Sequence, residues 1–196
     1  MKVIFLDIDG VLNWVGSKDR ICGFVGLDPT RIERFNRIIE AHPDAKIVVS
    51  STWRHSRMPG VYEDFDGLKV LLKERGLKGE IIDLTVKDYR LCSRGSEIRQ
   101  WVDDWEKDHP GEILNYVILD DDTSGMEGWI EEEGIWYNYG SGSEGWSPRQ
   151  EFRDLRHRHV VTFWDGEEGS GYNEPGLEGG LQDYHIEKAI KLLESP

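Results

Sequence analysis

The sequence is poor in cysteine and has no long apolar run. Only Cys22 and Cys92 occur in 196 residues, and they stand too far apart to form a CxxC pair. We expect both to be reduced and inert, because two lone cysteines do not build a disulfide framework. No apolar stretch approaches the roughly 20 residues needed to span a bilayer, and the run at the N-terminus is shorter than the core of a signal peptide. These absences predict a cytoplasmic protein that makes no membrane contact.

Positive charge is also scarce. Lysine and arginine number 24 against 38 acidic residues, so the net charge is −14. Such a chain repels polyanions at long range, and a phosphate-bearing substrate would have to be captured by local positive charge or by a metal ion. The hydrophobic content of 38% still supports a folded core. With no internal repeat or clear domain boundary, we expect residues 1–196 to form one domain, and the sequence leaves the oligomeric state open.

Short apolar runs alternate with amphipathic patterns along the chain. Buried strands are predicted at Val3–Leu6, Lys46–Ser50, Glu80–Leu84, Tyr116–Leu119 and Val160–Trp164. Helices are predicted from Pro29 to about His42, around Phe65–Leu72, around Ile98–Trp105 and over 183–194, with loops inside 137–180 at Tyr137–Ser147 and Asp165–Gly180. The alternation predicts an α/β fold: a three-layer, Rossmann-like parallel sheet with helices on both faces.

Polar residues follow three of the predicted strands. They are Asp7, Ser50 and Asp120. Ligand sites in open parallel sheets form beyond the carboxyl ends of the strands, so these three side chains are expected to meet in one site.

The first of these strands runs into the motif Asp7-Ile8-Asp9-Gly10. A strand end holds Asp7 rigidly, and a carboxylate in that place can attack phosphorus. Asp9 lies two residues further on, close enough to protonate a leaving oxygen. Gly10 allows the sharp turn that follows.

This segment resembles motif I of the haloacid dehalogenase (HAD) superfamily, in which the first Asp is the nucleophile and the second the general acid/base. The resemblance continues after the next strand. Ser50 best matches the Ser or Thr of motif II, whose hydroxyl bonds the phosphoryl group, and Ser51 is the alternative. Arg94 takes the place of the motif III base, which is usually Lys, and Lys87 is the second choice. A cation beside a helix N-terminus suits an anion site.

Three adjacent acids, Asp120, Asp121 and Asp122, resemble motif IV, whose carboxylates hold Mg²⁺. Oxygen ligands of this kind suit Mg²⁺ better than Zn²⁺. By the family register Asp121 is the direct ligand and Asp120 a second or water-mediated one, with Asp122 as a bystander. The resemblance also gives the cation Asp7 and the carbonyl of Asp9.

A narrower likeness is to the HAD-type domain of multidomain RNA repair proteins. It rests on Ser50–Arg54, Arg94–Val102, Asp120–Asp122 and the late Gly180-Leu181 pair, while the four motifs lie within residues 2–126. This likeness implies a nucleotide or a nucleic-acid terminal phosphate as substrate. We expect Ser51, Arg54, Gly10 and Trp53 to contact it, with Trp53 or Trp14 stacking on a base.

A basic stretch, Arg149–His159, holds four arginines and two histidines. It is either a helix with a solvated face or a basic lip beside the site that admits a nucleic-acid end. The spacer Asn13–Asp44 has room for one helix and a short flap, so the resemblance implies a minimal cap or none, and an open site.

Taken together, the motifs predict Mg²⁺-dependent hydrolysis of phosphomonoesters through an aspartyl-phosphate on Asp7. Ser50 and Arg94 would hold the phosphoryl oxygens. The alternatives are a small-molecule phosphatase, a phosphotransferase, or a catalytically silent module that binds phosphate. A dehalogenase is disfavoured, because that branch typically lacks the second motif I acid and needs no Mg²⁺.

Overall fold

A computed structural model describes residues 1–55, 60–85, 93–123, 126, 130–132, 135–137, 154–164 and 178–195. The strands are β1 (Lys2–Leu6), β2 (Arg20–Ile21), β3 (Phe24–Val25), β4 (Lys46–Val49), β5 (Glu80–Leu84), β6 (Asn115–Asp120), β7 (Ile130–Glu132), β8 (Ile135–Tyr137) and β9 (His159–Val161). The helices are α1 (Pro29–Ala41), α2 (Phe65–Glu74), α3 (Arg94–Asp108) and α4 (Asp183–Glu194), with 3₁₀ turns η1 (Thr52–His55) and η2 (Arg156–Arg158). None of the described helices has the length and apolar character needed to cross a membrane.

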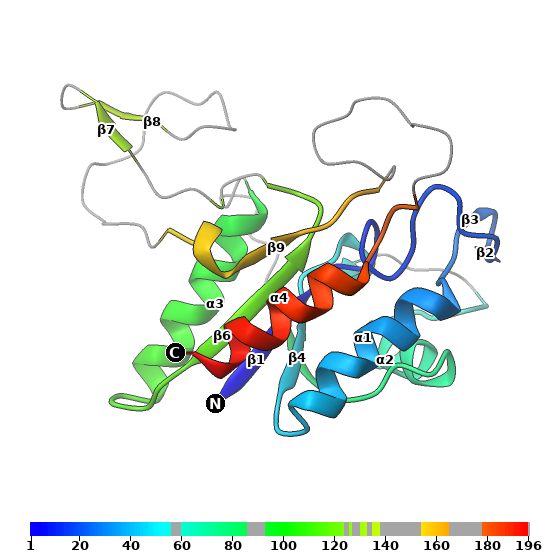
Figure 1. The fold of residues 1–196 in the computed structure, drawn as a ribbon, viewed down its shortest axis with the longest axis horizontal. Helices are drawn as coiled ribbons and strands as arrows, with labels where there is room; N and C mark the ends of the chain where they lie inside the picture. Colours follow the sequence, from blue (N-terminus) through cyan, green and yellow to red (C-terminus); the bar gives the residue numbers. More distant parts are fainter. Residues whose placement is uncertain are drawn as a thin grey trace.

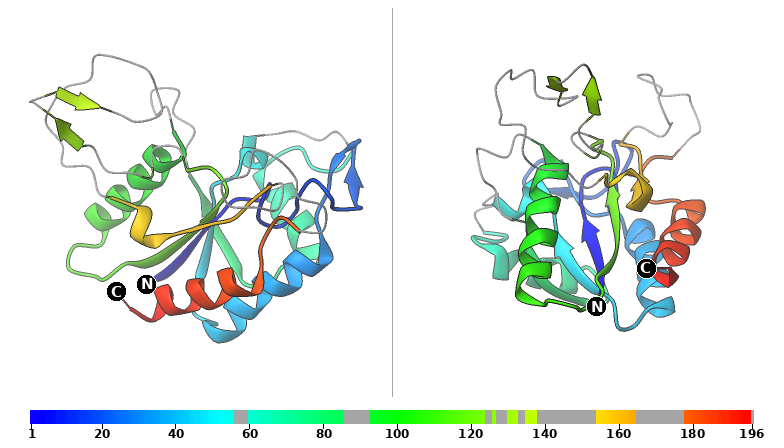
Figure 2. Two further views of the ribbon diagram at one scale, coloured as in Figure 1. Left: turned by 45° about the horizontal axis from the view of Figure 1, so that its top comes forward. Right: turned by 90° about the vertical axis from the view of Figure 1, so that its left-hand side faces the viewer.

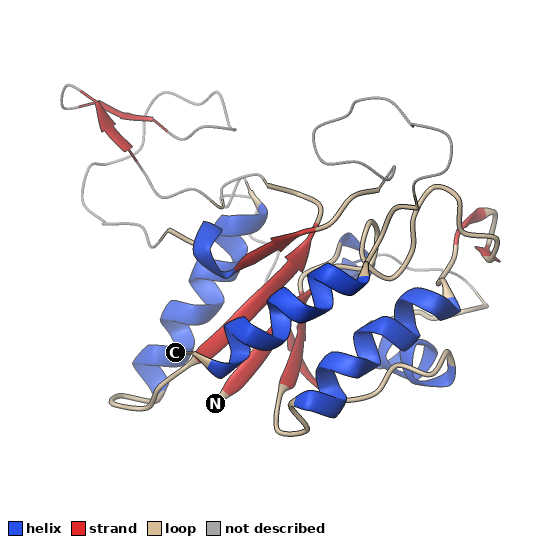
Figure 3. Ribbon diagram, viewed as in Figure 1, coloured by secondary structure: helices blue, strands red, loops and turns tan. Residues whose placement is uncertain are grey.

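Five of the strands form one parallel sheet in the order β5-β4-β1-β6-β9 (Figures 1 and 3). β1 is central, with Leu6 opposite Val49 of β4 on one side and Leu119 of β6 on the other. All five carboxyl ends therefore point to the same edge of the sheet. This confirms the predicted Rossmann-like α/β fold.

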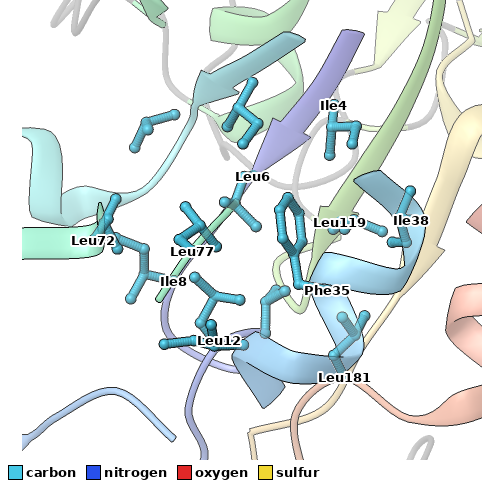
Figure 4. Close-up of a cluster of buried hydrophobic side chains, with 14 of the residues drawn as sticks. Ile4, Leu6, Ile8, Leu12, Phe35, Ile38, Leu72, Leu77, Leu119 and Leu181 are labelled. Atoms are coloured by element: carbon cyan, nitrogen blue, oxygen red, sulfur yellow. The ribbon is translucent and has the colours of Figure 1, made fainter. Parts of the chain in front are cut away.

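Helices cover both faces of the sheet. α1, α2 and α4 bury their apolar sides in one core, while α3 packs on the opposite face. The right-hand view of Figure 2 shows α3 on one side of the sheet, with α1 and α4 on the other. Figure 4 shows part of the larger core, which includes Ile4, Leu6, Ile8, Leu12, Phe35, Ile38, Leu72, Leu77, Leu119 and Leu181. Successive residues of β1 point to opposite faces of the sheet, so Ile4 and Leu6 pack in the larger core and Val3 and Phe5 in the other.

α1 illustrates how local sequence sets an element. The Asp28 side chain accepts a hydrogen bond from the Thr30 backbone N–H at 2.9 Å, and Pro29 occupies the first helical position. A proline there loses nothing, because that N–H has no partner inside the helix. The helix ends at Ala41, two residues before Pro43, as predicted.

The end of the fold differs from the prediction in two places. β9 spans His159–Val161, not Val160–Trp164, because β6 ends at Asp120 and offers no partner beyond it. Trp164 instead accepts a hydrogen bond from Val15, in the loop after β1. The described part of the basic stretch forms only the turn η2 and the start of β9, so the predicted helix is absent over Arg156–Arg158. Residues 149–153 and most of the two predicted loops lie outside the described residues.

The predicted flap is the hairpin β2–β3, whose two-residue strands the sequence did not reveal. Between β1 and β4 the chain contains only this hairpin and α1. Between β5 and β6 the described part contains only α3. The described chain therefore agrees with a minimal cap.

Candidate active site

Asp7 lies directly after β1, at the carboxyl edge of the sheet. Its backbone N–H donates to Leu119 at 3.0 Å, so the residue is held between β1 and β6. The side chain is almost wholly buried, and burial raises the pKa of Asp7. The charge of Arg94 and a hydrogen bond from Ser51 act in the opposite direction. The result is a rigid carboxylate whose negative charge is costly unless a cation is near.

Asp120 and Asp121 gather beside Asp7. One carboxylate oxygen from each of the three residues lies within 4.8 Å of the other two. Burial, and then the nearby Asp7, raises the pKa of Asp120 well above its ordinary value. The same two causes raise the pKa of Asp121 to about 7. Raised pKa values show that negative charge on these three acids is unfavourable, and a bound cation would stabilise their charged forms.

The group suits a hard divalent cation. The Asp7 Oδ1 atom is buried and has no hydrogen-bond partner among the described residues. The Asp120 Oδ1 atom accepts from the backbone N–H of Asp122 at 2.9 Å, while its Oδ2 atom faces Arg94 Nε at 3.1 Å. Asp121 is half-buried and reaches the group from the end of β6. Carboxylate oxygens from three residues are ligands of the kind that Mg²⁺ takes.

Gly10 makes room for this group. Its backbone has a φ of +71°, in the left-handed region that favours glycine. A Cβ atom at this position would lie 2.4 Å from Cγ of Asp121. A side chain on Gly10 would therefore push the Asp121 carboxylate out of place.

Arg94, the first residue of α3, is the buried cation of the site. Its Nη2 lies 4.0 Å from Asp7 Oδ1 and its Nη1 lies 3.4 Å from Glu97 Oε2. Burial works against the charge, but Asp120, Asp7 and Glu97 outweigh it and raise the pKa of Arg94. The guanidinium thus stays charged in the place predicted for the motif III base. Lys87, the second choice for that base, lies outside the described residues.

Arg54, predicted to contact the substrate, makes its described contacts within the protein. Its Nε donates to Thr85 O at 2.8 Å, and its Nη1 donates to the carbonyl oxygens of Ser50, at 2.8 Å, and Ser51. Its Nη2 pairs with Glu97 at 2.5 Å. With these donors occupied and only 2% of the side chain exposed, Arg54 fixes the loop after β4.

The two serines after β4 are both buried but differ in the hydrogen bonds of their hydroxyl groups. Ser50 is fully buried, and its Oγ has no hydrogen-bond partner among the described residues. Ser51 is also buried, and its hydroxyl hydrogen-bonds Asp7. Both therefore lie at the carboxyl edge of β4, beside the end of β1.

Asp9 is separate from the acidic group. Its Oδ2 accepts from Trp53 Nε1 at 2.9 Å, and its Oδ1 accepts from Asn13 Nδ2 at 2.9 Å. Trp53, predicted to stack on a base, is only 4% exposed, so its ring has almost no free surface for such a contact. Trp14 is half-buried, with the Arg31 guanidinium carbon 5.5 Å from the centroid of its ring.

The described part of the basic stretch does not form a lip at the site. Arg156 pairs with Asp154 at 2.6 Å. Arg158 donates to Asn115 Oδ1 at 3.0 Å and to backbone carbonyls near the end of α4. Asn115 begins β6, so Arg158 lies toward the amino edge of the sheet, away from the site. His159 is buried, and its Nε2 contacts the Asp120 carbonyl at 2.9 Å.

Sequence reasoning missed two residues of the site, Asn13 and Glu97. Both stand four residues or fewer from a predicted site residue, Asp9 and Arg94 respectively. A polar residue directly after the apolar pair Val11-Leu12 was the available signal for Asn13. For Glu97, the signal was an acid one helical turn after Arg94.

The fold and the site together define a class: HAD-like domains, with an acidic site at the carboxyl edge of a parallel sheet. The family model described as "HAD domain in Swiss Army Knife RNA repair proteins" matches residues 3–135, and the chain belongs to this family. No curated protein and no solved structure matched the chain. Membership of the family supports phosphatase-type hydrolysis of phosphate esters with a divalent metal ion.

Proposed function

We propose that this protein is a Mg²⁺-dependent phosphomonoesterase that works through an aspartyl-phosphate on Asp7. The observation that carries the proposal is the setting of Asp7: a buried carboxylate at the centre of the sheet edge, with Arg94 at 4.0 Å and two further acids within 4.8 Å. A buried arginine and two further acids that could hold a metal ion, all close to one carboxylate, suit a nucleophile that must approach an anionic phosphate.

The reaction has two displacements. In the first, an Asp7 oxygen forms a bond to phosphorus, the ester P–O bond breaks, and Asp9 gives its proton to the leaving oxygen. In the second, water attacks phosphorus, Asp9 takes a proton from the water, and the bond to Asp7 breaks. Arg94 and the Ser50 hydroxyl, which has no other described partner, hold phosphoryl oxygens.

The cation would be held by Asp7, Asp121 and Asp120, with the Asp9 carbonyl as the family analogy adds. When bound, it neutralises negative charge between the nucleophile and the phosphoryl group. Asp120 already faces Arg94, so we assign the direct contact to Asp121 and a secondary one to Asp120.

The proposed substrate is a nucleotide or the terminal phosphate of a nucleic acid. The family description refers to RNA repair proteins, and the described part of the chain places only the hairpin β2–β3 and α1 between β1 and β4, which supports a minimal cap and a site that accepts a large substrate. A net charge of −14 disfavours wrapping along a polyanion but permits capture of one terminal phosphate. We further propose that the protein acts in the cytoplasm.

Phosphate release from 3′- and 5′-phosphorylated oligonucleotides, nucleoside monophosphates and sugar phosphates tests the proposal. Wild-type protein with Mg²⁺ should release phosphate from at least one nucleotide-bearing substrate, and chelator should stop it. Preference for sugar phosphates would point to the small-molecule alternative. Transfer of the phosphoryl group to an added alcohol, in place of water, would identify a phosphotransferase. Binding of phosphate without hydrolysis of any of these substrates would support the alternative of a catalytically silent phosphate-binding module.

A further inference from the structure

The Asp9 carboxylate is held at both oxygens by side chains of this chain. Trp53 Nε1 donates to Oδ2 and Asn13 Nδ2 donates to Oδ1, each at 2.9 Å. The Asn13 amide is itself oriented, because its Oδ1 accepts from the backbone N–H of Gly10 at 3.2 Å. Both donors are buried, at 4% exposure for Trp53 and 0% for Asn13.

Trp53 is fixed from two further directions. Its backbone N–H donates to the Ser51 hydroxyl at 3.3 Å. Its carbonyl accepts from the Tyr62 hydroxyl, itself buried, at 3.1 Å. These two bonds fix the Trp53 backbone within the turn η1, and the buried ring then presents its indole N–H to Asp9.

We propose that Trp53 and Asn13 are positioning residues that aim the Asp9 carboxyl group at the leaving-group oxygen. This inference rests on the proposed function. An indole N–H can only donate, so it occupies one lone pair of Oδ2 and blocks rotation of the carboxyl group. The remaining lone pairs can carry the proton that passes to the leaving oxygen when the ester P–O bond breaks. Misplacement by about 1 Å can cost roughly 100-fold in rate, so such a clamp has a measurable effect.

Leaving-group chemistry separates this role from a structural one. p-Nitrophenolate leaves readily without a proton, whereas phenolate gains much more from protonation. The two phosphate esters differ only by one nitro group on the ring. A residue that only supports the fold would affect both equally, but a residue that aims the acid would affect phenyl phosphate more.

The experiment is kcat/KM of Trp53→Phe on phenyl phosphate and p-nitrophenyl phosphate. This ratio reports phosphoryl transfer from the ester to Asp7, and not the later hydrolysis step that both esters share. Phenylalanine keeps an aromatic ring but removes the N–H. We expect kcat/KM on phenyl phosphate to fall about 10-fold or more, with a fall of less than about 3-fold on p-nitrophenyl phosphate. Asn13→Ala removes the other donor to Asp9 and should show the same selectivity.

Trp101→Phe is the matched control. Its indole N–H also donates to a carboxylate, Asp83 at 2.7 Å, but at the protein surface away from Asp9. It should leave the ratio of the two rates unchanged. If Trp53→Phe fails to fold by circular dichroism, Asn13→Ala decides the outcome.

Equal losses of kcat/KM on both esters would overturn the positioning role and leave the proposed function intact. A wild-type protein that hydrolyses neither ester nor any substrate of the screen would overturn both.

Discussion

At the scale of single residues, the proposed chemistry depends on the charge of Asp7. Its carboxylate is buried beside two other acids, and burial raises its pKa. Negative charge at this position therefore costs stability in the absence of a cation. In the proposed mechanism the same charge makes the side chain the nucleophile.

Asp7→Asn should lower phosphate release at least roughly 1,000-fold, because the amide cannot attack phosphorus. The melting temperature without Mg²⁺ should stay the same or rise, because one of three crowded charges is gone. The measurements are phosphate release and thermal denaturation. Asp108→Asn, an exposed acid of α3, is the control and should change neither. Turnover near the wild-type rate in folded Asp7→Asn would refute the nucleophile assignment.

Glu97 joins the two buried arginines of the site. Its Oε2 atom lies 2.5 Å from Arg54 Nη2 and 3.4 Å from Arg94 Nη1. Glu97→Ala would leave Arg54, which burial already disfavours, without its charged partner. We expect the free energy of unfolding in urea to fall by about 3 kcal/mol.

The exposed Glu187 of α4 provides the comparison for Glu97. Glu187→Ala should change stability by no more than about 0.5 kcal/mol. A loss below about 1 kcal/mol for Glu97→Ala would show that it does not neutralise these arginines.

At the scale of elements, the sequence predicted those with strong local signals. β1 is a continuous apolar run, and α1 has the Asp28 cap, Pro29 and Pro43 as boundaries. The hairpin β2–β3 was missed, because strands of two residues carry no periodicity. The end of β9 was misjudged, because it is set by the length of β6 and not by its own residues.

The sequence predicted where the main residues of the candidate site lie, but not the contacts of all of them. The residues that follow strand ends, such as Asp7 and Ser50, could be found because parallel strands bring their ends together. The roles of Trp53 and Arg54 could not, because their partners, Asp9 and Glu97, are 44 and 43 residues away. The same N–H groups could face a substrate or the protein, and only the fold decides between them.

The turn after β1 gives a prediction at this scale. Gly10→Ala would place a Cβ atom against Asp121, which now lies 2.4 Å from that position. The Mg²⁺ concentration needed for half-maximal activity should therefore rise, and stability should fall by at least about 1 kcal/mol from the positive φ alone. Metal titrations of activity and urea denaturation measure the two effects.

Gly111→Ala separates backbone strain from the clash at Gly10. Gly111 also has a positive φ, +85°, but its Cβ position meets no atom within 4 Å. This variant should lose stability without any change in metal dependence. Equal metal dependence in both variants would show that Gly10 does not set the place of Asp121.

At the scale of the whole molecule, residues from both ends of the sequence, in β1 and in α4, pack together in the larger core. The family match ends at residue 135, yet α4 adds Ile186, Ala189 and Leu193 to the core beneath β1. Just before α4, Leu181 donates to the Val11 carbonyl in the turn after β1. The turn after β1, which carries Asp9 and Gly10, is therefore held in part by Leu181, a residue beyond the matched region.

Folding also concentrates acid at one point of a chain that is already negative. The group of Asp7, Asp120 and Asp121 forms within a molecule of net charge −14. An Asp in the unfolded chain titrates near pH ~3.9, whereas burial and Asp7 raise the pKa of Asp121 to about 7 in the fold. The folded state therefore holds this proton more tightly than the unfolded state does. The stability that the proton contributes is complete below about pH 4 and is lost as the pH rises through about 7.

When that proton is lost, bound Mg²⁺ should stabilise the acidic group in its place. We expect the rise in melting temperature on adding Mg²⁺ to be larger at about pH 8 than at about pH 5.5, because the metal competes with bound protons at the lower pH. Asp121→Asn removes the titrating group and should make the rise smaller and less dependent on pH. General repulsion among the surface acids is nearly the same in both proteins, so their difference isolates the site. An equal Mg²⁺-induced rise at both pH values in the wild-type protein would contradict a metal site that includes Asp121.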